Sequence, residues 1–170
     1  MGVRWLGTES VEMLMEQYEM EQLMAALPKY RLDGANITET IWSNGCFQDV
    51  DVAIKVFMRF FKGLSMYNVD LLMKREQACF AKQQLLPIPV SPGCILLPIR
   101  VRKPIGGHDG AYGYVSLDGI DEVLLEARGV CRSVIVLKGV DRRISTMMDQ
   151  RRLLQQAAIA DSIRHRYFTM

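Results

Sequence analysis

The chain has 170 residues, a length that fits one ordinary domain able to bury a core without disulfides or a metal. Its composition, 49% hydrophobic and 24% charged, excludes a disordered or collagen-like chain. The net charge of +2 indicates no global basic field directed at nucleic acid, and no apolar run reaches the roughly 18–20 residues that a membrane helix needs. Composition and motifs alone therefore indicate no chemistry.

The cysteines and the start of the chain point to a cytoplasmic protein. Residues 1–9 contain no apolar stretch of the kind found in a secretory signal. The four cysteines lie at least fifteen residues apart and form no CxxC pair, which speaks against a zinc ribbon or a redox motif. We expect reduced thiols that are buried as small hydrophobic groups, and no contact with a membrane.

Charge is distributed unevenly along the chain. Residues 9–21 hold five glutamates and no lysine or arginine. Residues 138–170 hold seven lysines and arginines against three aspartates, a local excess of four positive charges. A nearly neutral total thus conceals an acidic start and a basic end, and the local patch sets the local field.

The first expected element is an acidic amphipathic helix from about Ser10 to Leu27. Apolar residues recur there at the i, i+3, i+4 and i+7 spacing of a helix, and Thr8 or Ser10 could cap its start. Pro28 should end it, because proline disfavours a helical conformation in the preceding residue. We therefore expect residues 1–28 to form an acidic helical arm and residues 29–170 to form the main domain.

A hairpin and two helices should follow. The β-branched run at residues 37–42 is followed by Asn44-Gly45, a pair typical of a type I′ turn, so the chain should return through residues 46–50. A helix over residues 52–62 should begin at Asp49 or Asp51 and have Gly63 just past its end. A second short helix is expected near residues 71–76, within an otherwise ambiguous segment.

The rest of the chain should alternate extended segments and end in a helix. The prolines at 87, 89 and 92 predict a stiff loop over residues 86–93. A tight turn is expected at Lys138-Gly139, and Thr146 with Asp149 resembles a capping box. Strands are expected at residues 94–102, 112–117, 123–125, 133–137 and 140–144, and the last helix at residues 146–167. The order of elements predicts an α+β fold, a single domain with an antiparallel sheet and flanking helices.

Residues that could carry catalysis are few. His108 lies in the glycine-rich segment 105–110, which lacks the helix and the Lys or Ser/Thr register of a phosphate-binding loop and is best interpreted as a hairpin tip. The acids Asp118, Asp121 and Glu122 have the spacing of turn residues, with no histidine nearby. We expect no catalytic residues, no metal, no cofactor and no small-molecule substrate, although a ligand bound at the glycine-rich loop remains an alternative.

The basic residues are the stronger lead. Strand alternation would place Arg100 and Arg102 on one face, and the last hairpin and helix carry further pairs of arginines. If that hairpin and helix pack beside the strand at 94–102, one basic patch results. The alternative, favoured by charge alone, is a solvated surface paired with the acidic arm. The candidate DNA-binding residues are Arg100, Arg102, Lys103, Arg142, Arg143, Arg151 and Arg152.

From Leu32 to the C-terminus, about 135 residues, the chain resembles the competence transcription factors of Gram-positive bacteria. No single motif is specific, and the resemblance lies in the order and spacing of short pieces. These pieces are Asp33-Gly34, Arg59-Phe60-Phe61 followed by Gly63 and Ser65, the proline loop at 87–92, Cys94-Ile95-Leu96-Leu97-Pro98, Gly113-Tyr114-Val115, the turn at Lys138-Gly139, and Asp149-Gln150-Arg151. The acidic helix and the apolar Leu71-Leu72-Met73 depart from the family pattern.

The resemblance implies a cytoplasmic transcriptional activator without a cofactor. Such proteins bind A/T-rich double-stranded DNA, largely through the minor groove, as homo-oligomers. The basic residues named above would then contact phosphates and the groove. Two alternatives stay open: an interaction module or degenerate relative that does not bind DNA directly, with the acidic helix docking a partner or covering the basic patch, and an enzyme or ligand binder using residues 106–110.

Overall fold

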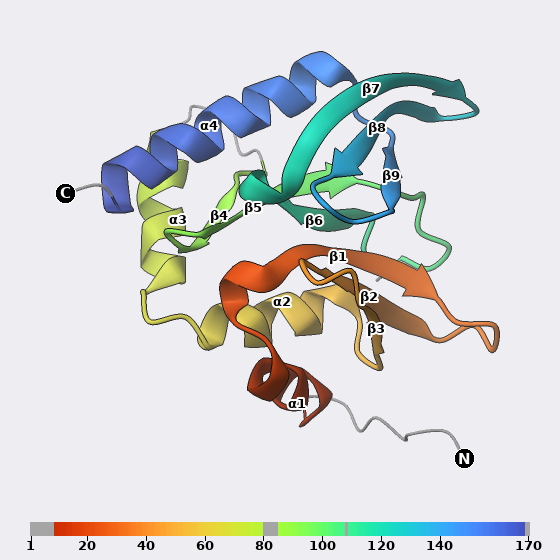
Figure 1. Cartoon of the computed structure of the whole chain (residues 1–170), viewed down its shortest axis with the longest axis horizontal. Coiled ribbons are helices and arrows are strands. Elements are labelled where there is room, and N and C mark those ends of the chain that lie inside the picture. Colours follow the sequence, from red (N-terminus) through yellow and green to blue (C-terminus); the bar gives the residue numbers. More distant parts are fainter. Residues whose placement is uncertain (1–8, 80–84, 108, 169–170) are drawn as a thin grey trace.

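The computed structural model describes residues 9–79, 85–107 and 109–168. They form an α+β domain of two antiparallel sheets with helices, as the sequence predicts (Figure 1). The strands are β1 (Leu23–Tyr30), β2 (Asn36–Trp42), β3 (Phe47–Val50), β4 (Ile88–Ser91), β5 (Cys94–Arg100), β6 (Tyr112–Ser116), β7 (Ile120–Arg128), β8 (Cys131–Leu137) and β9 (Arg143–Thr146). The helices are α1 (Glu9–Gln17), α2 (Ile54–Gly63), α3 (Val69–Ala78) and α4 (Gln150–Phe168), with short 3-10 turns at Met20–Gln22 and Leu117–Gly119.

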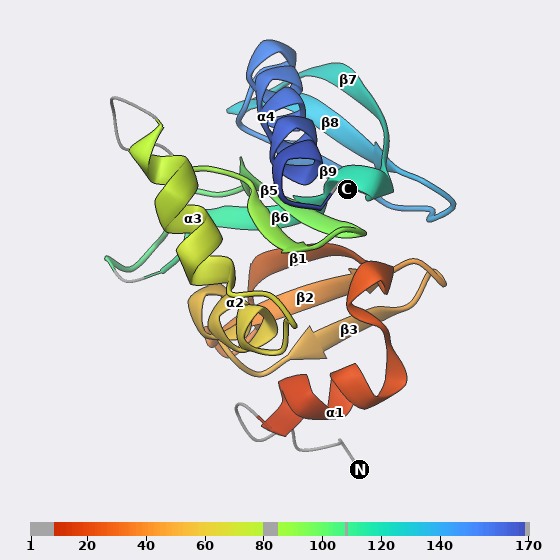
Figure 2. The ribbon, with the colours of Figure 1, turned by 90° about the vertical axis from the view of Figure 1, so that its left-hand side faces the viewer.

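The larger sheet has six strands in the order β3-β2-β1-β6-β5-β4. On one face it packs against α1 and α2, whose apolar side chains share one core. Figure 2 shows α2 across the lower strands and α1 below β3. The core between the sheet and these helices contains Trp42, Phe57 and Phe61, each fully buried. Burial of large aromatic side chains contributes most of the stabilisation on this face.

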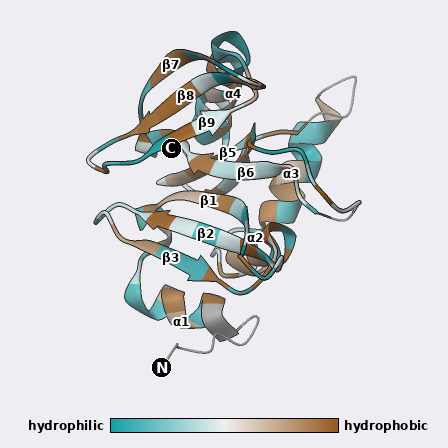
Figure 3. Cartoon of the chain, turned by 90° about the vertical axis from the view of Figure 1, so that its right-hand side faces the viewer, coloured by the Kyte–Doolittle hydropathy of each residue, from teal (hydrophilic) through white to brown (hydrophobic). Residues whose placement is uncertain are grey.

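The opposite face of the six-stranded sheet is covered by a second layer. A three-stranded sheet, in the order β7-β8-β9, packs against the middle strands through Ile99, Val115 and Ile135. Helix α4 covers β5 beside it, where Ala160 meets Ile95 and Leu97. In Figure 3, β8 is largely hydrophobic and the turn after it is hydrophilic. Burial alternates along β8, as expected for a strand with one face on the core.

The first helix is shorter than the sequence predicts. It ends at Gln17, and residues Leu23–Tyr30, expected to be helical up to Leu27, form β1 in the middle of the six-stranded sheet. A strand buried on both faces is a continuous apolar run, which helical spacing can match by chance. The expected boundary after residue 28 falls inside β1, so the acidic helical arm does not extend into the last residues assigned to it.

Several expected caps and turns were wrong, because capping depends on which groups the tertiary fold leaves unpaired. Helix α2 begins after Ala53 without a side-chain cap, and Gly63 is its last residue. Only Gly45 in the β2–β3 turn has a positive φ, +86°, so the three-residue loop is not type I′. The Thr146 hydroxyl, expected to cap α4, instead donates to the carbonyl of Arg100 at 2.8 Å.

Other corrections concern the prolines and the cysteines. Residues Ile88–Ser91, expected to be loop, form the edge strand β4, a position where sheets tolerate proline. Among the cysteines, Cys94 is buried as expected, whereas Cys46 and Cys79 are exposed. The β2–β3 hairpin, α2, α3, the later strands and α4 match the predicted segments within a few residues. In the described ranges, no helix is long and apolar enough to cross a membrane.

Candidate nucleic-acid interface

Arg100 ends β5 with an exposed side chain, and its backbone holds the start of the last helix. Its carbonyl accepts from the amide of Met147 at 2.9 Å and from the Thr146 hydroxyl at 2.8 Å. Its own amide donates to the sulfur of Met148 at 3.4 Å. The connection from β9 to α4 therefore packs against the end of β5, as the single-patch hypothesis requires.

Arg132, which was not among the predicted residues, lies beside Arg100. Ser133 pairs with Thr146 in the β8–β9 register, so Arg132 comes next along β8, opposite Met147. Arg100 and Arg132 line a surface hollow of about 410 Å³, completed by Gly129, Val130 and Met147. Two exposed guanidinium groups from distant parts of the chain therefore share one concave surface.

The β7–β8 hairpin adds a third arginine. Arg128 is exposed at the end of β7 and pairs with Cys131, which places it next to Arg132. Gly129, with φ +57°, makes the turn. Figure 1 shows this hairpin extending beyond β9, at the upper right of the molecule. We call Arg100, Arg128 and Arg132 the hairpin arginines; Glu126 is the acid closest to them along the hairpin.

Two of the predicted arginines, Arg151 and Arg152, lie in the first turn of α4, which is anchored on the three-stranded sheet. The side-chain amide of Gln150 donates to the carbonyl of Val123 at 2.8 Å and fixes the start of α4 on β7. Asp149 caps the helix by accepting from the amide of Arg152 at 2.8 Å. Arg151 and Arg152 both project into solvent immediately after this anchor.

Arg143, a further exposed arginine of this layer, lies on β9 opposite Val136. Alternation places it on the outer face of the three-stranded sheet, the face that also carries Arg132. Six arginines in this layer or at the adjoining end of β5 form no ion pair and no side-chain hydrogen bond with another described residue. They are Arg100, Arg128, Arg132, Arg143, Arg151 and Arg152.

Arg102 does not join Arg100. Because β5 ends at Arg100, strand alternation no longer governs the next residues. The Nε of Arg102 donates to the carbonyl of Gly110 and its Nη2 to Oδ1 of Asn36, both at 2.7 Å. Its guanidinium lies 4.1 Å from the centre of the Tyr30 ring. Arg102 therefore fastens the following loop to β1 and β2, and Lys103 is exposed in that loop.

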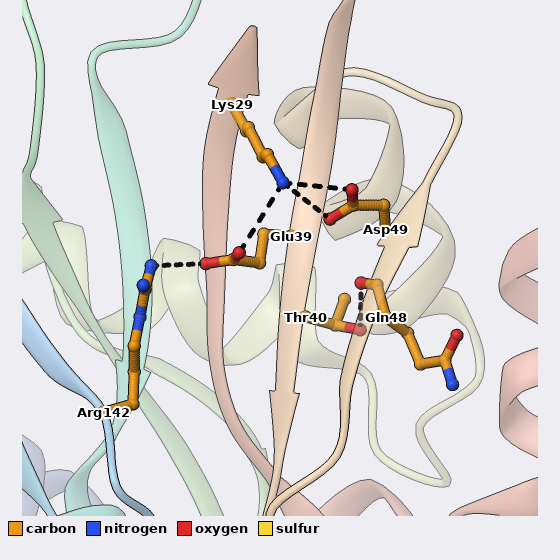
Figure 4. Close-up of polar contacts among 6 residues, drawn as sticks. All are labelled: Lys29, Glu39, Thr40, Gln48, Asp49 and Arg142. Atoms are coloured by element: carbon orange, nitrogen blue, oxygen red, sulfur yellow. Dashed lines mark hydrogen bonds and ion pairs between the residues drawn. The ribbon is translucent and has the colours of Figure 1, made fainter. Parts of the chain in front are cut away.

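Arg142 is neutralised by acids of the larger sheet. Its Nη2 lies 2.6 Å from Oε1 of Glu39 on β2, and Lys29 bridges Glu39 to Asp49 on β3 (Figure 4). The Lys29 ammonium is 3.8 Å from Glu39 and 3.1 Å from Asp49. The alternative to a single basic patch was that the basic residues form ion pairs with the acidic arm at the start of the chain. For Arg142 the partner is instead Glu39 on β2, a mostly buried carboxylate of the six-stranded sheet.

In the glycine-rich loop, residues 105–110, the Asp109 carboxylate lies where an anionic ligand would have to bind. Oδ2 of Asp109 accepts from the Tyr30 hydroxyl at 2.5 Å and from the Gly106 amide at 2.9 Å. The Gly106 amide, a donor that a bound phosphate would need, thus already donates to a carboxylate of the chain itself. His108 lies outside the described residues. Within the described ranges, no group of His, Cys, Asp and Glu side chains could hold a metal ion.

The acidic helix lies on the far side of the six-stranded sheet. Val11 and Leu14 of α1 are buried in the same core as Phe57 of α2. Arg128 and Arg132 belong to the layer on the opposite face, and Arg100, at the end of β5, lines the same hollow as Arg132. In the part of the chain that the structure describes, α1 therefore does not cover the basic surface.

No protein-family model, no curated protein and no solved structure gives a significant match to this chain.

Proposed function

We propose that this protein binds A/T-rich duplex DNA through the hairpin arginines and acts as a transcriptional regulator in the cytoplasm, in the manner of the competence factors that its sequence resembles. The observation that carries the proposal is the un-neutralised pair Arg100 and Arg132 on one hollow, beside a projecting hairpin. Arg143, Arg151 and Arg152 extend the positive charge along the same layer.

The chemistry of arginine supports this assignment. Its planar guanidinium matches phosphate oxygens and remains charged at any physiological pH. Each neutralised phosphate releases condensed counterions, which supplies sequence-independent affinity despite a total charge of only +2. Narrow A/T-rich minor grooves have an enhanced negative potential that attracts inserted arginines. A two-stranded ribbon is also a shape that DNA grooves admit.

A salt series on two matched double variants tests the proposal. We expect Arg100→Ala with Arg132→Ala to weaken binding to an A/T-rich duplex and to reduce the slope of log K against log salt by about 1–2. The matched control is Lys55→Ala with Lys74→Ala, which removes the same charge from exposed positions of α2 and α3. Fluorescence anisotropy of a labelled duplex measures both quantities.

Two results would refute the proposal. One is a wild-type protein that shows no salt-dependent affinity for duplex DNA, which would favour the interaction-module alternative. The other is an equal loss of slope in the two double variants, which would mean that only total charge matters.

A further inference from the structure

The hairpin that carries the arginines also exposes apolar side chains. Leu125 on β7 has 78% of its surface accessible, and Val130 in the turn has 53%. Among the described residues of the three-stranded sheet and its turns, these are the large hydrophobic side chains with the greatest exposure. Leu125 and, through its pairing with Cys131, Arg128 lie on the core-side face of the hairpin, whereas Arg132 lies on the outer face. Val130 lines the hollow that Arg100 and Arg132 share.

The exposure of Leu125 follows from the sheet register. Strand β9 pairs with β8 only from Ser133 to Val136, so the hairpin beyond Ser133 is a ribbon of two strands. Leu125 pairs with Ser133, the last position with a third strand. By alternation it continues the face on which Val123 packs against the core. Ser133 and Thr146 in the same row are fully buried, whereas Leu125 lies on the edge strand β7 and projects into solvent.

We propose that Leu125, assisted by Val130, acts as an apolar wedge that enters between base pairs of the bound duplex and unstacks them. This inference rests on the proposed function. Proteins that bend DNA insert leucine and similar side chains between base steps while adjacent arginines hold the phosphates. The pyrimidine–purine steps of A/T-rich DNA are the easiest to unstack. Burying Leu125 against bases would remove its apolar surface from water and offset part of the unstacking cost.

The probe is an A/T-rich duplex in which 2-aminopurine replaces adenine at successive TA steps, because its fluorescence rises when a base unstacks. We expect wild-type protein to raise the signal at one or two adjacent steps. Leu125→Ser should abolish most of this rise and weaken binding by about tenfold, while the salt slope stays unchanged because phosphate contacts are kept. The fold should be retained, since Leu125 makes few packing contacts.

Leu32→Ser is the matched control. Leu32 is a fully exposed leucine in another turn, and its neighbour Arg31 is neutralised by Asp33 and Asp51. This variant should keep both the fluorescence rise and the affinity. A wild type that binds with a steep salt slope but leaves 2-aminopurine stacked would overturn the wedge and leave DNA binding intact. Equal effects of the two variants would also overturn it, whereas absence of any binding would refute the proposed function itself.

Discussion

At the scale of single residues, Cys94 shows how burial changes chemistry. It lies in the core under the first helices, and burial, assisted by the negative charge of Glu21, raises the pKa of its thiol to about 12. The sequence predicts a buried thiol at every cysteine, but Cys46 lies in a turn and Cys79 ends α3. Hydrophobicity indicates which residue types are usually buried, whereas the individual position depends on the fold.

The raised pKa of Cys94 predicts a loss of stability at high pH. Below about pH 9 the thiol is protonated in both the folded and the unfolded state. Above that pH the unfolded thiol ionises while the folded one does not until about pH 12, so rising pH favours unfolding. Relative to Cys94→Ala, the wild type should lose on the order of 1 kcal/mol per pH unit over this window. Urea unfolding at pH 8 and pH 10.5 measures it; a constant difference between the two proteins would contradict the expectation.

The surroundings of single residues also explain which residues of the candidate interface can be predicted from the sequence. Arg100, Arg143, Arg151 and Arg152 are recognisable as exposed cations from charge and strand alternation. Arg132 requires the β8 register, because it belongs to the interface only through its position opposite Met147. The engagement of Arg102 with Asn36 and Gly110 joins segments far apart in sequence, and no local pattern encodes such a contact.

At the scale of elements, a buried carboxylate ties α3 to α4. Glu76 has only 2% of its surface exposed, and it accepts from a guanidinium nitrogen of Arg166 and, at 2.7 Å, from the hydroxyl of Tyr167. A buried charge is tolerated when it is paired and hydrogen-bonded, so the last turn of α4 is required to keep this carboxylate satisfied. The rings of Phe168 and of Tyr67, in the α2–α3 connection, also pack in a T-shaped arrangement with their centres 4.8 Å apart.

Removing the two partners should have unequal effects. Arg166→Met leaves the Glu76 carboxylate buried with only Tyr167, and we expect a cost of about 2 kcal/mol, discounted because Arg166 is half exposed. Glu76→Gln removes the buried charge itself and keeps an acceptor for Tyr167, so its cost should be smaller. Thermal or urea unfolding compares them, and the reverse ranking would show that Glu76 is not stabilised by this pair.

Element boundaries show where local patterns fail. The segment Leu23–Leu27 has both helical spacing and a continuous apolar run, and only its place between β2 and β6 selects the strand. By contrast, α2 and the β2–β3 hairpin combine strong periodicity with turn residues, and both were predicted within a few residues. Consistency between local preference and tertiary packing therefore separates the correct assignments from the wrong one.

At the scale of the whole molecule, the six-stranded sheet separates the acidic helix α1 from the arginines of the three-stranded sheet. Helix α1 with its glutamates packs in the core on one face, and Arg128 and Arg132 belong to the layer on the other. A total charge of +2 therefore describes neither surface. This separation allows a duplex to approach the basic layer without displacing the acidic helix.

Deleting residues 1–17 tests this separation while leaving β1 intact. The loss of Val11 and Leu14 from the core should lower the free energy of unfolding by several kcal/mol in total. At a temperature where the truncated protein is still folded, its salt slope for duplex DNA should equal that of the full chain. A marked rise in affinity would instead indicate that the acidic segment competes with DNA for the arginines.

The most direct test of the account is the binding of an A/T-rich duplex by Arg132→Glu over a salt series. Reversing this one charge should weaken binding several-fold at low salt and flatten the salt slope by about one unit or more. If the variant binds with the wild-type affinity and slope, the β7–β8 hairpin is not where this protein meets DNA.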